Sequence, residues 1–266
     1  MCTAVLLIEA GRPVLLAGVR DELTDRPWEA PAEHWPRDPD LLGGRDLQAG
    51  GTWLAVAQAR HRVSCVLNGT GQAAPTASRR SRGELPLLAA AGEQPDQLAD
   101  FDPFLLIVAE PGLAVLRTWN GAQLTEHVLP DGLHFVVNSG HASELAGAGG
   151  TTTDWAGPDW QGAPPPDGRE HELARAAWFL SRFRAASRPE PVPGKPVADA
   201  WGSWFPRVNG DGIEPHDERA LIVRRELDGS RTWGTTSVSL VALTPDWVRY
   251  DFCPVPGDAA AWYQVL

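Results

Sequence analysis

The chain has 266 residues, with 34 Asp and Glu against 23 Lys and Arg, and its formal net charge is −11. A nucleic-acid backbone is repelled by this charge, and no basic stripe offsets it, so the composition excludes a nucleic-acid partner. No apolar stretch is long enough to span a bilayer and no signal peptide is visible, so we expect a cytoplasmic protein without a membrane span.

The first 68 residues predict two β-hairpins. Residues 2–8 and 13–19 are apolar runs separated by a short turn, which is typical of paired buried strands. Residues 52–57 and 62–68 form a second such pair. The segment 23–50 between the two hairpins is rich in Pro and Gly, and we interpret it as a loop.

A polar segment and a short helix follow the hairpins. Residues 69–82 contain the only basic cluster of the chain and are interpreted as a solvated loop. A helix is predicted over 84–91, and Ser81 and Glu84 have the spacing of a capping box at its start. A further helical turn is expected at 96–99.

The second half of the chain predicts one long helix among strands. The helix covers 170–186, where apolar residues recur at helical spacing, and the Pro-rich stretch 188–197 ends it. Residues 142–169 look irregular. The predicted strands are 103–110, 113–119, 122–128, 133–138, 218–226, 234–243 and 246–252.

This order of elements predicts a β-rich α+β fold. Hydrophobic residues make up 43% of the chain, enough for a sizeable core. The Pro-rich segment 187–198 has the composition of a linker. However, too few strands follow it to bury a core of their own, so we expect a single domain over 1–266.

The cysteine and histidine patterns point to neither a metal nor a cofactor. The three cysteines form no CxxC pair. Cys65 alternates with apolar residues in a predicted strand, which favours a buried, inert thiol. His127, His134 and His141 recur every seven residues, but Pro and Gly interrupt any helix there, and we interpret this spacing as coincidence.

Cys2 is the strongest candidate for chemistry. Methionine is usually removed before a small second residue, and Cys2 would then carry both a thiol and the α-amine. An amine with a pKa of roughly 7.7–8.0 can accept the thiol proton near neutral pH, so no separate histidine is required. The predicted strand that follows would hold this terminus in place, although a cysteine at position 2 is also common by chance.

Several short motifs follow Cys2 in a specific order, and together they resemble the NRDE family, which includes the transport and Golgi organisation proteins. The resemblance is closest over residues 1–85 and weaker beyond. The motifs are Cys2-Thr3, Arg20-Asp21-Glu22, Arg26-Pro27, Gly43-Gly44-Arg45-Asp46, Gly50-Gly51-Thr52-Trp53-Leu54 and Ser81-Arg82-Gly83-Glu84.

That family in turn resembles the cysteine N-terminal-nucleophile amidases, and the resemblance implies a four-layer αββα fold with antiparallel sheets. It implies that Cys2 attacks an amide or related acyl bond of a small molecule, as a hydrolase or acyltransferase. Asp21 and Arg20 match the residues that orient the terminus, while Asn68 and Asn138 match the amides that stabilise an oxyanion.

Other interpretations remain open at this stage. Val19 stands where the family motif has Asn, and residues 235–237 are Thr-Thr-Ser where the family has an Arg, so activity could be lost. The chain would then be a non-catalytic haem or lipid carrier or chaperone, or an interaction domain. Arg20-Asp21-Glu22 also suits a solvated strand end, and both asparagines suit ordinary turns. The acidic charge disfavours anionic ligands unless Arg20, Arg45 and Arg82 make the pocket locally basic. The sequence does not indicate the oligomeric state.

Overall fold

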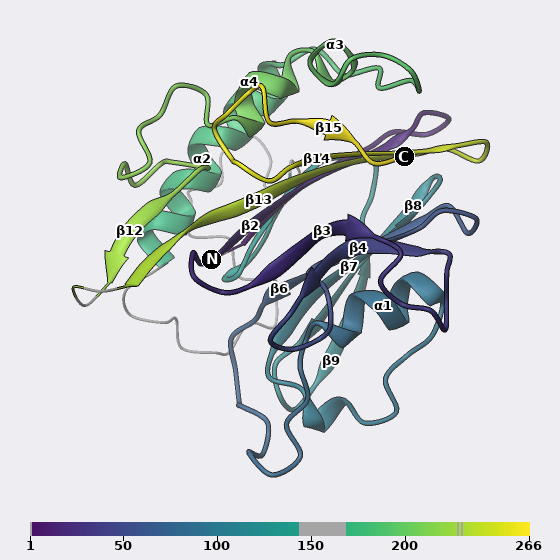
Figure 1. Cartoon of the computed structure of the whole chain (residues 1–266), viewed down its shortest axis with the longest axis vertical. Coiled ribbons are helices and arrows are strands. Elements are labelled where there is room, and N and C mark those ends of the chain that lie inside the picture. The colour runs from purple at the N-terminus through teal and green to yellow at the C-terminus, as the bar shows by residue number, and fades with distance from the viewer. Residues whose placement is uncertain (1, 144–168, 228, 230) are drawn as a thin grey trace.

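The computed structural model describes residues 2–143, 169–227, 229 and 231–266, which form two facing antiparallel sheets with helices on their outer sides (Figure 1). The α+β class and the antiparallel sheets are therefore as the sequence predicts. No helix in these ranges has the length and apolar character needed to cross a membrane.

The first sheet contains both termini of the described chain. Its strands are β1 (Thr3–Ile8), β2 (Val14–Leu23), β10 (Gly132–Val137), β11 (Gly140–Ser143), β12 (Arg224–Leu227), β13 (Arg231–Leu243), β14 (Val248–Cys253) and β15 (Tyr263–Gln264). They are ordered β11-β10-β1-β2-β13-β14-β15, and β12 pairs with β13. The first strand thus lies between β10 and β2, so its N-terminal end has a neighbour on each side.

The second sheet is a meander of consecutive strands. It runs through β3 (Trp28–Ala32), β4 (Leu41–Asp46), β5 (Leu54–Ala57), β6 (Arg62–Asn68), β7 (Phe104–Glu110), β8 (Leu113–Trp119) and β9 (Leu124–Val128). Each strand pairs with the next in the chain, and the connection from β6 to β7 is the long segment 69–103 rather than a hairpin.

Alternation along β1 explains how the sheets and helices stack. Ala4 and Leu6 face the second sheet, where they share a core with Leu54 of β5. Val5 faces the other way and packs with Phe179 of the helix α2 (Arg169–Ala185). Because the strand is buried on both faces, it reads as a continuous apolar run rather than an alternating one.

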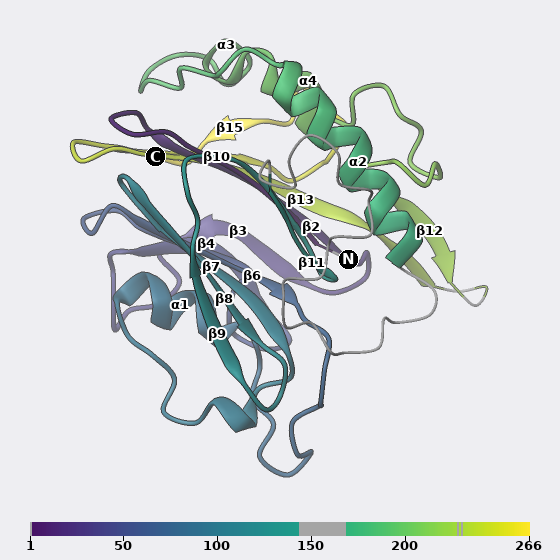
Figure 2. The ribbon, with the colours of Figure 1, turned by 180° about the vertical axis from the view of Figure 1, so that it is seen from behind.

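The remaining helices cover the outer faces of the sheets, as Figures 1 and 2 show. The helices α3 (Val197–Trp201) and α4 (Trp204–Val208) join α2 over the first sheet, with Trp201 and Trp204 fully buried there. Beneath the second sheet lies α1 (Glu84–Ala91), followed by the short 3₁₀ helix η1 (Leu98–Asp100).

Several elements differ from the sequence-based prediction. The segment expected to be a loop, 23–50, contains β3 and β4. Gly43 and Gly44 are residues of β4 and not of a turn. Glycine is needed at position 43 because a Cβ there would lie 2.5 Å from the carbonyl oxygen of Leu54. The expected strand 218–226 is mostly buried irregular chain, with β12 only at its end. The elements β11, β15, α3 and α4 were not predicted, because they are too short to show a recognisable hydrophobic periodicity.

The start of α1 also differs from the expected capping box. The N-cap is Gly83, and the Ser81 hydroxyl accepts a hydrogen bond from its N–H at 3.1 Å. Glu84 instead binds the Arg80 guanidinium at 2.6 Å. The long helix matches its prediction closely, and the irregular segment expected at 142–169 lies mostly outside the described residues.

His134 and His141 are brought together by the hairpin of β10 and β11. Their rings stack with centroids 5.2 Å apart, and the nitrogens His134 Nδ1 and His141 Nε2 are 3.0 Å apart. His134 Nε2 donates to the Pro130 carbonyl at 2.8 Å, so in the neutral pair its Nδ1 accepts the proton of His141. The hairpin therefore puts these two histidines on one face of the first sheet, whereas His127, the first of the three, lies in β9 of the second sheet.

We expect this pair to make stability depend on pH. Burial, with the neighbouring His134 and His127, lowers the pKa of His141 to about 4. The unfolded chain, with a histidine pKa of about 6.5, then binds more protons than the folded chain between these values. The free energy of unfolding should be level above pH 6.5 and fall by about 3 kcal/mol as the pH drops to 4. Urea denaturation across this range measures the slope, and an equal slope in His141→Gln would contradict the assignment.

Candidate functional site

Cys2 lies at the end of the first sheet and is fixed by contacts to the strands on both sides. Its backbone N–H donates to Oδ1 of Asn138 at 3.3 Å, just beyond the end of β10. Its Sγ lies 3.8 Å from the carbonyl oxygen of Asp21 in β2. The register of Thr3 with Val19 and with Val137 produces this arrangement. The thiol is half-buried and packs against the core between the sheets.

The side chain of Asp21 points to the opposite face of the sheet, towards α2. Its Oδ2 is 3.2 Å from Nη1 of Arg175, and its Oδ1 accepts a hydrogen bond from the Thr235 hydroxyl at 2.7 Å. Both charged side chains are completely buried. Arg175 also donates to Thr3 Oγ1 at 3.2 Å. Asp21 therefore meets Cys2 through its backbone, while its carboxylate joins the sheet to the helix.

A second polar contact ties α2 to the same end of the sheet. Glu172 accepts a hydrogen bond from the Ser139 N–H at 2.9 Å, next to Asn138. Sequence analysis missed both Glu172 and Arg175, although they continue the buried stripe of Ala176 on the helix. Charged residues on the apolar face of a predicted helix are the signal that could have found them.

Arg20 shares the inner face of the sheet with Cys2. Its guanidinium lies 4.3 Å from the ring centre of Trp53 in the facing sheet and donates to the Thr236 hydroxyl at 2.7 Å. Thr236 occupies the bulge where the pairing of β13 with β2 shifts register. The charge of Arg20 is thus held between the sheets, 5% exposed, beside the thiol.

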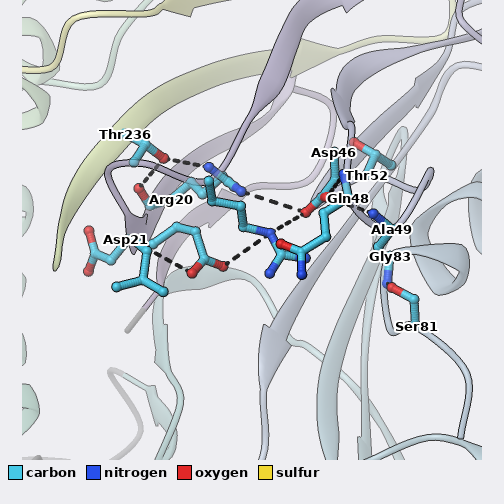
Figure 3. A network of polar contacts seen from close by, with 12 residues as sticks. Arg20, Asp21, Asp46, Gln48, Ala49, Thr52, Ser81, Gly83 and Thr236 are labelled. Atoms are coloured by element: carbon cyan, nitrogen blue, oxygen red, sulfur yellow. Dashed lines mark hydrogen bonds and ion pairs between the residues drawn. The ribbon is translucent and has the colours of Figure 1, made fainter. Parts of the chain in front are cut away.

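Asp46 anchors Arg20 to the second sheet, as Figure 3 shows. It lies 3.8 Å from Arg20 and accepts a hydrogen bond from Arg26 at 2.7 Å. The N–H groups of Gln48 and Ala49 donate to its other oxygen, each at 2.9 Å. Burial alone would raise the pKa of Asp46, but these hydrogen bonds lower it on balance. The carboxylate therefore stays charged and closes the loop after β4.

Asn68 is not part of this cluster. It is exposed at the end of β6, where Cys65 and Leu67 face the first sheet. Val66 packs on the α1 side, and strand alternation puts Asn68 on that side too. The structure therefore brings together Cys2, Arg20, Asn138 and the backbone of Asp21. The Asp21 carboxylate, which the resemblance implies would orient the terminus, points to the other face of the first sheet, and Asn68 lies on the opposite face of its own sheet.

The thiols differ in their surroundings. Burial raises the pKa of Cys65, which has no charged partner, and raises that of Cys253 to about 11. Burial, with the charge of Asp21, also raises the pKa of Cys2, although the hydrogen bond to the Asp21 backbone and the charge of Arg20 act in the opposite direction. Cys2 is thus the thiol with a positive charge beside it, but its pKa is still raised on balance, so it needs a base to form the thiolate at neutral pH.

Comparison with known proteins supports the resemblance drawn from the sequence. The family model described as Transport and Golgi organisation 2 matches residues 1–144, more than half of the chain. No curated protein matches the sequence of the chain. The matched region contains Cys2, Arg20, Asp46 and Asn138, whereas Arg175 and Thr235 lie beyond it.

We expect the buried ion pair to be essential for stability. Replacing Arg175 with Met leaves the Asp21 carboxylate buried without a countercharge, which should cost about 3 kcal/mol of unfolding free energy in urea denaturation. The double variant Arg175→Met/Asp21→Asn should regain part of this loss, because no unpaired charge remains. Arg224→Met is the control, since that side chain is 61% exposed, and it should change stability little. A double variant no more stable than Arg175→Met would contradict the pairing.

Proposed function

The chain belongs to the Transport and Golgi organisation 2 family, and we propose that it is a cysteine hydrolase or acyltransferase that acts on an amide or related acyl bond. The main observation in support of this proposal is the fixed position of Cys2, whose N–H and thiol contact the chain on either side of β1. Chain termini usually fray, so a terminus held on both sides indicates a use for it.

The arrangement of the elements supports this proposal. Helices cover the outer faces of two antiparallel sheets whose inner faces share one core. This is the layering expected of an N-terminal-nucleophile hydrolase, with the nucleophile at the start of a central strand. We therefore assign the four-layer αββα fold to this chain as part of the proposal.

The proposed reaction begins with removal of Met1. The freed α-amine of Cys2 accepts the thiol proton, and Sγ attacks the carbonyl carbon while the π electrons move to the oxygen. Collapse of this intermediate breaks the C–N bond, and the leaving nitrogen takes the proton from the amine. The resulting thioester is cleaved by water, or by an acceptor amine in a transferase, and the thiol regains its proton.

Each neighbouring residue has a role in this scheme. Asn138 Oδ1 orients the amine, because it already accepts a hydrogen bond from that nitrogen. Arg20 favours the thiolate and the developing oxyanion, since its charge lies on the same face as the thiol. Asp21 is a positioning residue, because its buried carboxylate binds Arg175 and so fixes the strand β2 that flanks Cys2. Asn68 has no role in this scheme, because it faces away.

The carrier hypothesis has no specific observation in its favour. The hollow around Gly69 and Arg82 and the hollow around Arg62 and Glu110 contain neither a tryptophan nor a histidine in their linings. Trp28 and Trp53 pack edge to face with each other, 5.8 Å between ring centres, rather than around an open space.

The test uses p-nitrophenyl acetate and intact-mass measurement. Wild-type protein should lack Met1 and gain one acetyl group on Cys2, with a rate that rises through the amine pKa of roughly 7.7–8.0. Cys2→Ala should gain none and keep its melting temperature. Cys65→Ala is the matched control: it should be acetylated normally, although the cavity costs about 1 kcal/mol of stability.

A second control separates the proposed mechanism from simple thiol reactivity. A lysine inserted between Met1 and Cys2 blocks removal of Met1 and leaves the nitrogen of Cys2 in a peptide bond. The thiol is unchanged, but its base is gone, so acetylation should fall strongly. Retained Met1 in the wild-type protein, or equal acetylation of the inserted variant, would refute the N-terminal mechanism and leave the carrier as the better hypothesis.

A further inference from the structure

An open hollow of about 400 Å³ lies where the loop after β6 meets the segment before β7. Its lining consists of residues 69–71, Ala73, Arg79, Arg82 and the segment 102–103. The composition of this loop predicts a solvated segment, and the loop contains the only basic cluster in the sequence.

Backbone contacts preform the wall of this hollow. The N–H of Gly69 donates to the Pro103 carbonyl at 2.9 Å, and the N–H of Gln72 donates to the Asn120 carbonyl at 2.8 Å. A Cβ on Gly71 would lie 2.0 Å from the Asn120 carbonyl oxygen, so the loop needs glycine there to approach so closely. The hollow is therefore a built feature and not the result of a loosely packed loop.

The three arginines of the basic cluster have different surroundings. Arg80 is neutralised by Glu84 and Asp96, each 2.6 Å away. Arg79 lies in the hollow and pairs with Asp102 at 3.3 Å. Arg82 donates to the Pro103 carbonyl at 2.9 Å and has no carboxylate within ion-pairing distance among the described residues.

Arg82 is therefore a positive charge without an ion-pair partner among the described residues, in a protein with a net charge of −11. Burial lowers its pKa on balance, while the charge of Asp102 acts in the opposite direction. Thr70 lines the same hollow, and its buried hydroxyl has no hydrogen-bond partner in the part of the chain that the structure describes. A guanidinium that donates only to one carbonyl and a hydroxyl without a partner are donors that a carboxylate would satisfy.

The hollow is connected to the candidate nucleophile through a short chain of contacts. Gly83, next to Arg82, accepts a hydrogen bond from the Thr52 N–H at 2.9 Å, and a Cβ on Gly51 would lie 2.4 Å from its carbonyl (Figure 3). Trp53 follows directly and lies under Arg20, beside Cys2. Arg82, which lines the hollow, is thus one residue away from a segment that contacts this cluster.

We propose that this hollow binds a carboxylate of the substrate whose acyl bond reaches Cys2, with Arg82 as the main partner and Thr70 as a second donor. The inference rests on the proposed function and adds the substrate class, a small acyl compound with a remote carboxylate. Because Arg79 is already offset by Asp102, the hollow has one positive charge to match, which suits a carboxylate better than a dianionic phosphate.

The test compares the rates at which matched electrophiles label Cys2. The reagents are iodoacetyl ω-amino acids with two to six methylenes and their neutral N-methylamides; in each case the thiolate displaces iodide. At one tail length or more, the carboxylate reagent should label Cys2 about tenfold faster than its amide. Arg82→Gln should lose this preference, whereas Arg82→Lys should keep part of it and Arg224→Gln should keep all of it. Melting temperatures check that each variant is folded.

Direct binding separates failure of this inference from failure of the proposed function. Calorimetry with butyrate, which has a single carboxylate, should show binding that Arg82→Gln weakens about tenfold, with weaker binding of inorganic phosphate. Labelling of Cys2 by neutral reagents without any carboxylate preference, and no butyrate binding, would refute the carboxylate site while leaving Cys2 as the nucleophile. Butyrate binding that depends on Arg82, with Cys2 inert to all reagents, would keep the hollow as an anion site and refute the proposed function. Tighter binding of phosphate than of butyrate would refute the choice of carboxylate.

Discussion

The buried pair of Asp21 and Arg175 determines where every other part of the site can lie. Two charges without solvent contact are tolerated only when each is the partner of the other, so β2 and α2 cannot shift apart independently. Asp21 also holds Thr235 of β13, and Arg175 holds Thr3 of β1. One ion pair thus fixes three adjacent strands at the level of Cys2. The guanidinium retains two buried nitrogens without partners among the described residues, which is a cost that the rest of the core must offset.

A second polar network lies on the inner face of the first sheet and joins that sheet to the second one, as the buried pair joins it to α2 on the outer face. Arg20 lies between the sheets, stacked on Trp53 and near Asp46, so the position of the first sheet against the second is set by polar contacts as well as by apolar packing. Asp46 in turn closes its loop through two backbone N–H groups. Because successive residues of β2 point to opposite faces, Arg20 and Asp21 serve the two networks from one place in the sequence.

The sequence predicts those elements whose pattern is local and leaves out those that depend on contacts far along the chain. The strand 62–68 and the helix 84–91 match within a residue, because alternation and apolar spacing define them. β3 and β4 were missed because Gly43 acts through close approach to another strand, which no local pattern records. Cys2 and Asn138 were proposed from the family resemblance and do lie in contact, while Asn68 fits the same turn pattern on the wrong face. Arg175 was missed because the helix was predicted from its apolar period alone, and a charged residue on the apolar face shows that a buried partner is needed but not which residue it is.

The residues that carry the family resemblance mostly hold the architecture together around Cys2. Arg20 and Asp46 join the sheets, and Gly51 is required where the chain passes against Gly83. Such residues fix Cys2, the proposed nucleophile, but are already engaged with one another, so under the proposed function they offer little to distinguish one substrate from another. In that proposal, substrate selectivity has to come from side chains whose polar groups the fold leaves unused. Arg82 is such a group: it belongs to a family motif, yet the fold satisfies only part of its guanidinium, and the rest faces open space beside the site.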